Sequence, residues 1–241
     1  MQEQFSRTIR LIGENAFQKL QNATVMVIGL GGVGGHAFDS LLRVGIGHII
    51  AVDGDDISLS NCNRQLLATH ATLGMRKVQA AVERGMVVSP TTKITPVDLF
   101  VTRENAFDLI STYHPDVVLD CIDTVGAKVA LAKAAQDLGI FMVACMSTGN
   151  KFDPTRLMVS DIAKTHTCPL SRVMRRELKE MGVSHLTVVW SDETPVTPME
   201  TPTEHGKHIP ASLPFVPPSA GILMGKVAVD EILKTRGVPN E

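Results

Sequence analysis

Short apolar runs rich in β-branched residues alternate along this chain with longer segments whose pattern is compatible with helices. A nearly all-apolar run is typical of a strand that is buried on both faces of a sheet. Such strands are predicted over residues 24–30, 48–53, 93–99, 116–122 and 141–147. Helices are predicted between them, over residues 34–43, 75–87, 104–112 and 125–138. This alternation predicts right-handed βαβ units, and hence a doubly wound, Rossmann-like α/β fold with a mostly parallel sheet.

The pattern changes after Gly149. A strand, a helix and another strand are predicted next, over residues 156–161, 169–181 and 186–190. A last helix is predicted over residues 220–234. We expect these elements to form a C-terminal extension beside the main sheet. Because no internal repeat divides the chain, residues 1–241 are predicted to form one domain.

The segment before the last helix is unusually rich in proline. Seven of the 13 prolines fall between Pro195 and Pro218. Proline lacks an amide N–H and fixes φ, so this stretch is predicted to form neither a helix nor a central strand. We therefore expect a long crossover loop that is mobile over about residues 192–212.

Composition narrows the class of protein. Of the 241 residues 44% are hydrophobic, which is enough to bury a sizeable core and excludes a disordered chain. No uncharged apolar run approaches the roughly 18–20 residues of a membrane span. The N-terminus lacks the basic-then-apolar pattern of a signal peptide, which predicts a cytoplasmic protein. The net charge of −2 provides no global basic field for nucleic acid.

A glycine cluster directly follows the first predicted strand and begins the next helix. Its glycines are Gly29, Gly31, Gly32 and Gly34. Such a loop lets the backbone approach a phosphate closely, and the helix N-terminus supplies free N–H groups. Asp53 ends the second strand, where a carboxylate can accept hydrogen bonds from ribose hydroxyls. These features predict a nucleotide site, but they suit a nicotinamide dehydrogenase and an ATP-dependent enzyme equally well.

The residues after the second strand favour ATP. They include Asp55, Asn61, Arg64 and Gln65, and Lys77 follows twelve residues later. Arg64 as a bidentate fork and Lys77 as a point charge can together neutralise a triphosphate, and an oxidoreductase would not need both. Asp123 ends the fourth strand, where an open α/β sheet places ligand-binding groups. A carboxylate that faces phosphates most simply holds Mg²⁺.

These residues, with Phe5-Ser6-Arg7 near the N-terminus, resemble the motif of the ThiF/MoeB/HesA family, the bacterial relatives of the ubiquitin-activating E1 enzymes. The resemblance implies a single E1-like adenylation domain, in which a substrate carboxylate attacks the α-phosphate of ATP and pyrophosphate leaves. It implies a homodimer in which Arg7 reaches the ATP of the neighbouring subunit. It also implies that Asp53 holds the ribose, that Asp55, Asn61, Gln65, Arg64 and Lys77 complete the nucleotide site, and that Asp123 binds Mg²⁺. Catalytic roles then fall to Arg7, Arg64, Lys77 and Asp123.

The later part of the chain resembles one branch of this family, the tRNA threonylcarbamoyladenosine dehydratases. The similar segments are Thr167-Cys168-Pro169-Leu170, Arg175-Arg176-Glu177-Leu178 and residues 212–218. The resemblance implies that the enzyme adenylates the threonyl carboxylate of the modified adenosine at position 37 of certain tRNAs. The adjacent ureido group then closes a ring, so the net change is loss of water. A sulfur-relay protein is a further partner that this branch leaves open.

Three other functions stay open at this point. The first is an adenylyltransferase that activates the C-terminus of a ubiquitin-like sulfur carrier. It is disfavoured because such enzymes typically carry two CxxC zinc pairs, whereas the cysteines here are Cys62, Cys121, Cys145 and Cys168. The others are an NAD-dependent oxidoreductase and a nucleotide-binding adaptor that does not turn ATP over.

Two features of the predicted helix over residues 169–181 allow two interpretations each. Cys168 precedes Pro169 at its start, so it is either a structural cap or, as in related E1 enzymes, a transfer cysteine. The cations off its apolar stripe are Arg172, Arg175, Arg176 and Lys179. They form either a solvated face balanced by glutamates or a track for tRNA phosphates.

Overall fold

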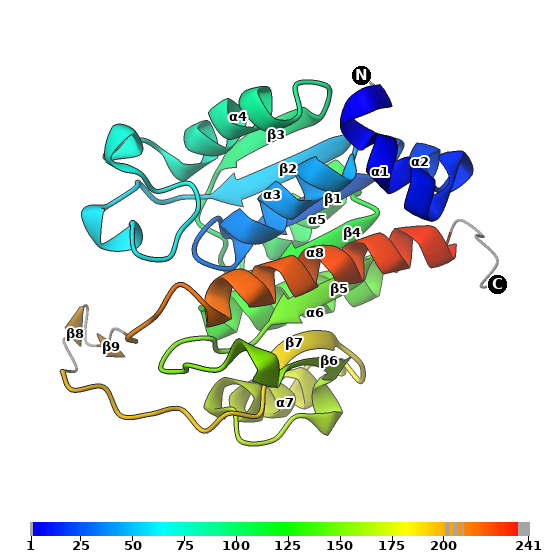
Figure 1. The fold of residues 1–241 in the computed structure, drawn as a ribbon. Helices are drawn as coiled ribbons and strands as arrows, with labels where there is room; N and C mark the ends of the chain where they lie inside the picture. Colours follow the sequence, from blue (N-terminus) through cyan, green and yellow to red (C-terminus); the bar gives the residue numbers. More distant parts are fainter. Residues whose placement is uncertain (1, 201–202, 205–206, 209, 236–241) are drawn as a thin grey trace.

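Seven strands form one sheet in the order β3-β2-β1-β4-β5-β7-β6 in a computed structural model, which describes residues 2–200, 203–204, 207–208 and 210–235 (Figure 1). The strands are β1 (Thr24–Ile28), β2 (His48–Asp53), β3 (Lys93–Asp98), β4 (Val117–Asp120), β5 (Phe141–Cys145), β6 (Leu157–Asp161) and β7 (Thr187–Ser191). All neighbouring strands of this sheet pair in parallel, except that β6 runs antiparallel to β7. The predicted doubly wound, mostly parallel α/β fold is thus confirmed, including the two strands of the extension.

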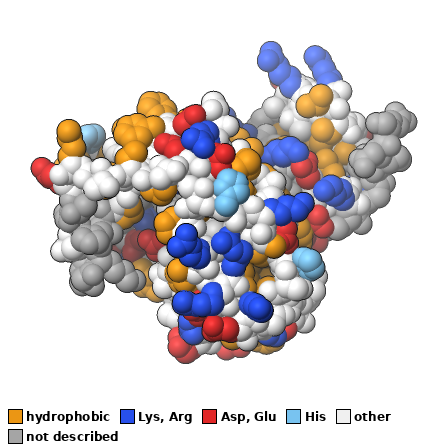
Figure 2. Space-filling model, turned by 90° about the horizontal axis from the view of Figure 1, so that it is seen from below, with side chains coloured by type: hydrophobic (Ala, Val, Ile, Leu, Met, Phe, Trp, Pro, Cys, Tyr) orange, Lys and Arg blue, Asp and Glu red, His pale blue; other side chains and the backbone are white. Residues whose placement is uncertain are grey.

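Helices cover both faces of the sheet. One core packs α3 (Gly34–Val44), α4 (Lys77–Val88) and α8 (Val216–Thr235) against one face. The other core packs α5 (Ala106–Tyr113), α6 (Val125–Leu138) and α7 (Pro169–Glu180) against the opposite face. Strand β1 illustrates the division, since Val25 and Val27 enter the first core and Met26 and Ile28 the second. Helix α7 lies at the lower end of the molecule in Figure 1, the end that faces the viewer in Figure 2.

Two N-terminal helices were not predicted from the sequence. They are α1 (Gln2–Ile12) and α2 (Glu14–Gln21). They pack through Phe5 and Phe17, whose ring centroids lie 5.1 Å apart, and a Cβ added at Gly45 would lie 2.6 Å from the Phe17 ring. Phe5, Ile9 and Ile12 recur at the i, i+4, i+7 spacing of one helix face, whereas Arg7 and Arg10 are exposed, so this helix carries an amphipathic pattern that was not used in the prediction.

The proline-rich segment differs in part from expectation. Helix α8 begins at Val216 rather than at residue 220, so the prediction that the stretch up to Pro218 excludes a helix is wrong at its end. Pro217 and Pro218 occupy the first turn, where backbone N–H groups lack intrahelical acceptors and proline is tolerated. Upstream, β8 (Thr203–Glu204) and β9 (Lys207–His208) form a separate two-stranded ladder. Residues 201–202, 205–206 and 209 of the predicted mobile loop lie outside the described residues, and the mobility stays a prediction.

Short 3₁₀ turns complete the described elements. They are η1 (Leu59–Asn61), η2 (His70–Thr72), η3 (Pro154–Arg156) and η4 (Ile162–Lys164). None of the helices in the described part of the chain combines the length and the apolar character that a membrane span requires.

A buried ion pair joins α6 to the ends of β4 and β5. The ammonium of Lys128 donates to Asp120 Oδ2 at 2.8 Å and to the carbonyl oxygen of Cys145 at 2.9 Å, and both charged side chains are fully buried. It also donates to the carbonyl oxygen of Ile122 at 3.2 Å. Burial raises the pKa of Asp120, and the charge of Lys128 opposes this shift. The pair therefore fixes the backbone that leads from β4 to Asp123.

Removing one partner of this pair should be severe. We expect Lys128→Met to lower the free energy of unfolding by about 3–5 kcal/mol, because it leaves the buried Asp120 carboxyl without its counter-charge. Urea unfolding measures this change. The control is Lys133→Met on the same helix, whose exposed i,i+4 pair with Asp137 is worth less than about 1 kcal/mol. A similar small loss in both variants would contradict the prediction, whereas Asp120→Leu combined with Lys128→Met should recover most of the stability.

Candidate nucleotide-binding site

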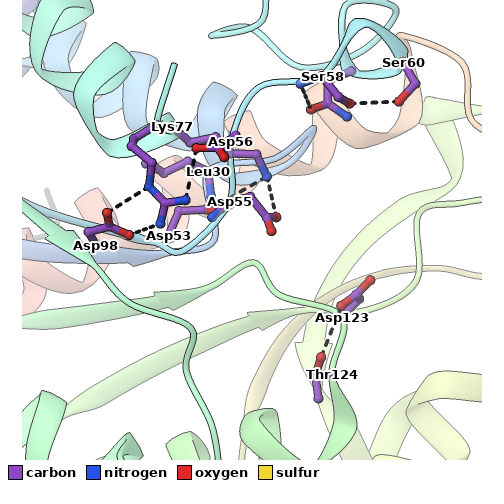
Figure 3. A network of polar contacts seen from close by, with 12 residues as sticks. Leu30, Asp53, Asp55, Asp56, Ser58, Ser60, Lys77, Asp98, Asp123 and Thr124 are labelled. Carbon is purple, nitrogen blue, oxygen red and sulfur yellow. Dashed lines mark hydrogen bonds and ion pairs between the residues drawn. The ribbon is translucent and has the colours of Figure 1, made fainter. Parts of the chain in front are cut away.

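The predicted site residues are carried mainly by the loops that follow β1, β2 and β4. These three strands are neighbours in the sheet and run in the same direction, so their carboxyl ends lie at one edge. The glycine loop follows β1, the segment from Asp53 to Lys77 follows β2, and Asp123 follows β4 (Figure 3). Ligands of open α/β sheets bind at such an edge.

The four glycines of the loop differ in what an added side chain would contact. Gly29 has φ +87°, and a Cβ there would lie 2.9 Å from Ile122 Cγ2. A Cβ at Gly34 would lie only 1.7 Å from the carbonyl oxygen of Gly29, so the turn into α3 requires both residues. At Gly31 the nearest atom to an added Cβ is Gln65 Nε2 at 3.8 Å, and at Gly32 it is Pro217 Cβ at 3.3 Å. The fold leaves room at Gly31, where a bare backbone suits a phosphate that approaches closely.

Asp53 connects the end of β2 to the glycine loop. Its Oδ2 accepts a hydrogen bond from the backbone N–H of Leu30 at 2.6 Å, and its Oδ1 accepts from that of Asp55 at 2.8 Å. The residue is 8% exposed. Each carboxylate oxygen can accept more than one hydrogen bond, so Asp53 keeps acceptor capacity for a ribose hydroxyl.

Lys77 is held in the same cluster, at the first turn of α4. Its Nζ lies 2.8 Å from Asp55 Oδ2 and 3.6 Å from Asp53 Oδ2, and its side chain is 7% exposed (Figure 3). The structure thus brings Lys77 to the site, but paired with carboxylates. Because Asp55 is about half exposed, an arriving phosphate oxygen can take its place as partner of the ammonium.

Arg64 lies beside the glycine loop without a carboxylate partner. Its Nη1 donates to the carbonyl oxygen of Ser60 at 3.0 Å and to Asn63 Oδ1 at 2.9 Å. Its Cγ would lie 3.4 Å from a Cβ at Gly32. Burial lowers the pKa of Arg64, although a guanidinium stays cationic at neutral pH. Within the described residues no carboxylate reaches it, so its charge is available to an anion at the loop.

Asn61 and Gln65 shape the segment that carries Arg64. Asn61 Oδ1 accepts from the backbone N–H of Ser58 at 3.1 Å and so stabilises the turn η1. The backbone N–H of Gln65 donates to the carbonyl oxygen of Asn61 at 2.9 Å, and the largely buried Gln65 side chain faces Gly31. Gln65 therefore lies at the glycine loop, whereas Asn61 orders the turn that leads to Arg64.

Asp123 stands apart from the Asp53 cluster (Figure 3). It is exposed, and the neighbouring Thr124 hydroxyl donates to its Oδ1 at 3.4 Å. No three His, Cys, Asp or Glu side chains of the described chain are grouped so that they could hold a metal ion. A single free carboxylate still fits Mg²⁺, which is usually held by one or two carboxylates together with phosphate oxygens and water.

Arg7 is the one predicted site residue that the structure does not bring to this edge. It is exposed on α1, two residues from Phe5, which lies against Gly45 after the end of α3. Helix α3 begins at the glycine loop and has 11 residues, so Phe5 is about 16 Å from that loop along the helix. Figure 1 likewise places α1 at the end of the sheet opposite to the loop after β2.

The cysteines are explained by packing. Burial raises the pKa of Cys145 to about 12 and that of Cys121 well above its usual value, as expected for packing thiols. Cys168 is the N-cap residue of α7 and is 2% exposed. Burial raises its pKa, but the polar groups of Ser171 and Ser147 and the charge of Lys151 together bring it below the usual value. Its lack of exposure favours the structural interpretation over a transfer cysteine.

No local pattern pointed to Asn63 or to the Asp120–Lys128 pair. Asn63 stands between two motif residues and contacts its neighbour Arg64, but its contact with Ser212 depends on how distant segments meet. Lys128 lies in a predicted helix that is rich in Ala and Lys. The sequence pattern there does not show which of the lysines is buried.

Comparison with known proteins agrees with this geometry. The tRNA threonylcarbamoyladenosine dehydratase of Bacillus subtilis (strain 168) is 36% identical over 245 residues, covering 97% of this chain and 96% of that protein. The solved structure of the Escherichia coli tRNA N6-threonylcarbamoyladenosine dehydratase in complex with AMP is 33% identical, with a TM-score of 0.86, covering 98% of this chain and 94% of that chain. The same protein in complex with ATP gives a TM-score of 0.83 at the same identity and coverage.

The sequence also matches a model of a whole protein family, and this match does not depend on any single relative. The model of the ThiF family matches residues 5–235, which span almost the whole chain. The matched residues contain the glycine loop, the Asp53–Lys77 segment, Asp123 and the extension with α7 and α8. This protein belongs to the ThiF family.

Proposed function

We propose that this protein is an ATP-dependent tRNA threonylcarbamoyladenosine dehydratase. The observation that carries the proposal is Arg64, a partly buried guanidinium without a carboxylate partner in the described chain, beside a loop that leaves room for a phosphate at Gly31. Relatives that align over nearly the whole chain bear this name, and one of them was solved with AMP and with ATP. Residues 1–241 would form the one domain that carries out the whole reaction.

The reaction needs an activated carboxylate and little else. A threonyl carboxylate oxygen of N6-threonylcarbamoyladenosine, at position 37 of tRNA, attacks the α-phosphorus of ATP, and pyrophosphate leaves. The adjacent ureido group then attacks the acyl carbon, and AMP departs with the carboxylate oxygen. The net change in the nucleoside is loss of one water. Adenylation turns a poor oxide leaving group into AMP, so no carrier cysteine is required.

Each site residue has a role in this proposal. Asp53 accepts from the ribose, Gln65 lines the loop, and Arg64 holds the phosphates with Asn61 and Lys77. Lys77 would exchange Asp55 for a phosphate oxygen. Asp123 would hold Mg²⁺, which when bound neutralises charge on the phosphate oxygens.

The test is nucleoside mass spectrometry on tRNA that carries threonylcarbamoyladenosine, after incubation with the protein and Mg-ATP. We expect a product lighter by one water and an equal amount of AMP. Asp123→Ala should abolish both, by about 100-fold or more, with an unchanged thermal midpoint, because it removes an exposed carboxylate and no packing. EDTA should have the same effect as the substitution.

Asp137→Ala is the matched control, since it removes an exposed carboxylate from α6 away from the site. Full turnover by Asp123→Ala would contradict the role of Asp123. An unchanged nucleoside from protein that binds ATP would overturn the proposed substrate. Release of pyrophosphate only when a protein ending in Gly-Gly is added would instead support activation of a sulfur carrier.

A homodimer with Arg7 acting in the partner's site is the second part of the proposal. It is supported by the position of α1, which lies at the far end of its own subunit's sheet. We expect Arg7→Ala to lower kcat, and the mixture of Arg7→Ala with Asp123→Ala to regain about a quarter of the wild-type rate after subunit exchange. A mixed dimer then holds one site with both residues intact.

The control for exchange is the same mixture made with Arg10→Ala in place of Arg7→Ala, since Arg10 is a second exposed arginine of α1. That mixture should keep at least the activity of its unmutated sites. No regain from the Arg7→Ala mixture, in samples where mixed dimers are detected by native mass spectrometry, would contradict action across the interface.

The outer face of α7 is the proposed contact with tRNA phosphates. Figure 2 shows Lys and Arg side chains gathered on this end of the molecule. Arg172 and Lys179 are exposed, whereas Arg175 is tied to the carbonyl oxygen of Thr165 at 2.9 Å and is not free for phosphate. Arg103 reaches Glu177 of α7 at 3.6 Å and lies against Gly126, close to Asp123. A basic track thus leads from α7 toward the site.

We expect Arg172→Glu combined with Lys179→Glu to weaken tRNA binding about tenfold or more and to reduce the slope of log affinity against log salt by about 2, since each residue contributes one phosphate contact. ATP affinity should not change. The matched control is Lys226→Glu with Lys234→Glu on α8, which covers the other face of the sheet. Equal losses in the two double variants would point to a general charge effect and contradict a track on α7.

Two further expectations belong to this proposal. We expect the reaction to take place in the cytoplasm, and a sulfur-relay protein stays a predicted partner.

A further inference from the structure

The C-terminal part of the crossover loop is held by two asparagines from loops that follow different strands of the sheet. The backbone N–H of Asn150 donates to the carbonyl oxygen of Ala211 at 2.8 Å, and Asn150 Oδ1 accepts from the backbone N–H of Ala211 at 2.8 Å. Asn63 Nδ2 donates to the carbonyl oxygen of Ser212 at 3.0 Å. We call residues 211–212 the strap. The strap is therefore bonded on both sides over two consecutive residues.

The order of the strands decides where the strap lies. Asn63 follows β2 and Asn150 follows β5, and the two strands between them in the sheet are β1 and β4. With about 4.8 Å between neighbouring strands, β2 and β5 are about 14 Å apart. Their two loops nevertheless meet at adjacent residues, so they converge over the carboxyl ends of β1 and β4. These are the ends that carry the glycine loop and Asp123.

Asn150 is suited to this position by backbone and side chain together. Its φ is +59°, a left-handed conformation that asparagine adopts more readily than most residues. Its carbonyl oxygen also accepts from the backbone N–H of Val196 at 2.9 Å, so Asn150 holds the crossover loop near its beginning and near its end.

Asn63 links the strap to the phosphate-binding residue. Its Oδ1 accepts from Arg64 Nη1 at 2.9 Å, while the Nδ2 of the same amide donates to Ser212. The guanidinium draws electron density toward Oδ1 and so strengthens the donor at the other end of the amide. A phosphate that fixes Arg64 would therefore also fix Asn63 and the strap.

Resting on the proposed function, we propose that Asn63 and Asn150 are positioning residues that hold the strap as a wall of the substrate site, and that Asn63 couples ATP binding to tRNA binding. A phosphate bound at Arg64 would strengthen the bond that Asn63 already makes to the strap, so less of the cost of fixing the strap falls on tRNA binding. By linkage, tRNA tightens ATP binding by the same factor.

The experiment measures the Kd of threonylcarbamoyladenosine-containing tRNA with and without a non-hydrolysable ATP analogue. For the wild type we expect the analogue to tighten tRNA binding at least about 5-fold, the lower end of typical couplings between sites. In Asn63→Ala the factor should fall to about one at saturating analogue, and because the factor is a ratio within one variant, a change in the Kd of the analogue measured alone does not enter it. A role limited to stability would not change this ratio.

Asn105→Ala is the matched control. Asn105 Oδ1 accepts from the backbone N–H of Thr102 at 2.8 Å and its Nδ2 donates to the carbonyl oxygen of Phe100 at 2.9 Å, so its amide likewise accepts one bond and donates one just before α5, but neither bond involves a guanidinium. Its variant should keep the wild-type coupling at a similar change in thermal midpoint.

Asn150 is tested with two variants that separate its backbone role from its side chain. Asn150→Gly keeps the left-handed backbone and removes the acceptor, so the KM for tRNA should rise about tenfold with kcat for pre-bound substrate less affected. Asn150→Asp keeps an oxygen acceptor for the N–H of Ala211 and should restore the KM. Equal KM values in the Gly and Asp variants would overturn the role of this side chain.

The outcomes distinguish the inference from the function on which it rests. If the wild type converts the nucleoside but Asn63→Ala keeps the full coupling factor, the inference is wrong and the proposed function stands. If the wild type binds the ATP analogue but neither binds nor converts the modified tRNA, the proposed function is wrong and the inference is overturned with it.

Discussion

The hydrogen bond from the backbone of Leu30 to Asp53 is the interaction on which the geometry of this edge depends. It joins the end of β2 to the glycine loop after β1, and the same carboxylate also orders Asp55 and faces Lys77. A buried carboxylate is costly unless it is paired and hydrogen-bonded. Here the groups that satisfy Asp53 come from the glycine loop, the segment after β2 and the start of α4. The carboxylate therefore holds these three segments together, and the loop is preorganised before any ligand arrives.

The opposite side of the edge is organised by the same principle with different groups. The Asp120–Lys128 pair is fully buried, and the backbone carbonyls of Ile122 and Cys145 satisfy the rest of the ammonium. Asp123 thus projects from backbone that the buried pair holds in place. Its own side chain is exposed and accepts a hydrogen bond from the neighbouring Thr124 hydroxyl. Rigid support beneath a free polar group is the arrangement that ligand sites require.

Local patterns predicted most of this fold, and the reasons for the failures are physical. A strand that is buried on both faces, or a glycine loop between a strand and a helix, has a signature in consecutive residues. The sheet and the positions of Gly29 and Asp53 could therefore be predicted from the sequence. The bond between Asn63 and Ser212 joins residues 149 positions apart, and no local pattern records it. The pairing of Lys77 with Asp55 could not be predicted either, because the sequence shows that a residue is charged but not which residue it contacts. Helix α1 was missed although Phe5, Ile9 and Ile12 have helical spacing, so this failure was one of interpretation and not of missing local signal.

Because Asn150 binds both Val196 and Ala211, the chain between these two residues is closed off as a loop of its own. Chain entropy changes slowly with loop length, by about 0.6 kcal/mol for each doubling. The part between the anchors can therefore lengthen, shorten or change sequence in evolution while the strap keeps its place over β1 and β4. A change of length or sequence between the two anchors therefore need not disturb the glycine loop or the residues after β2.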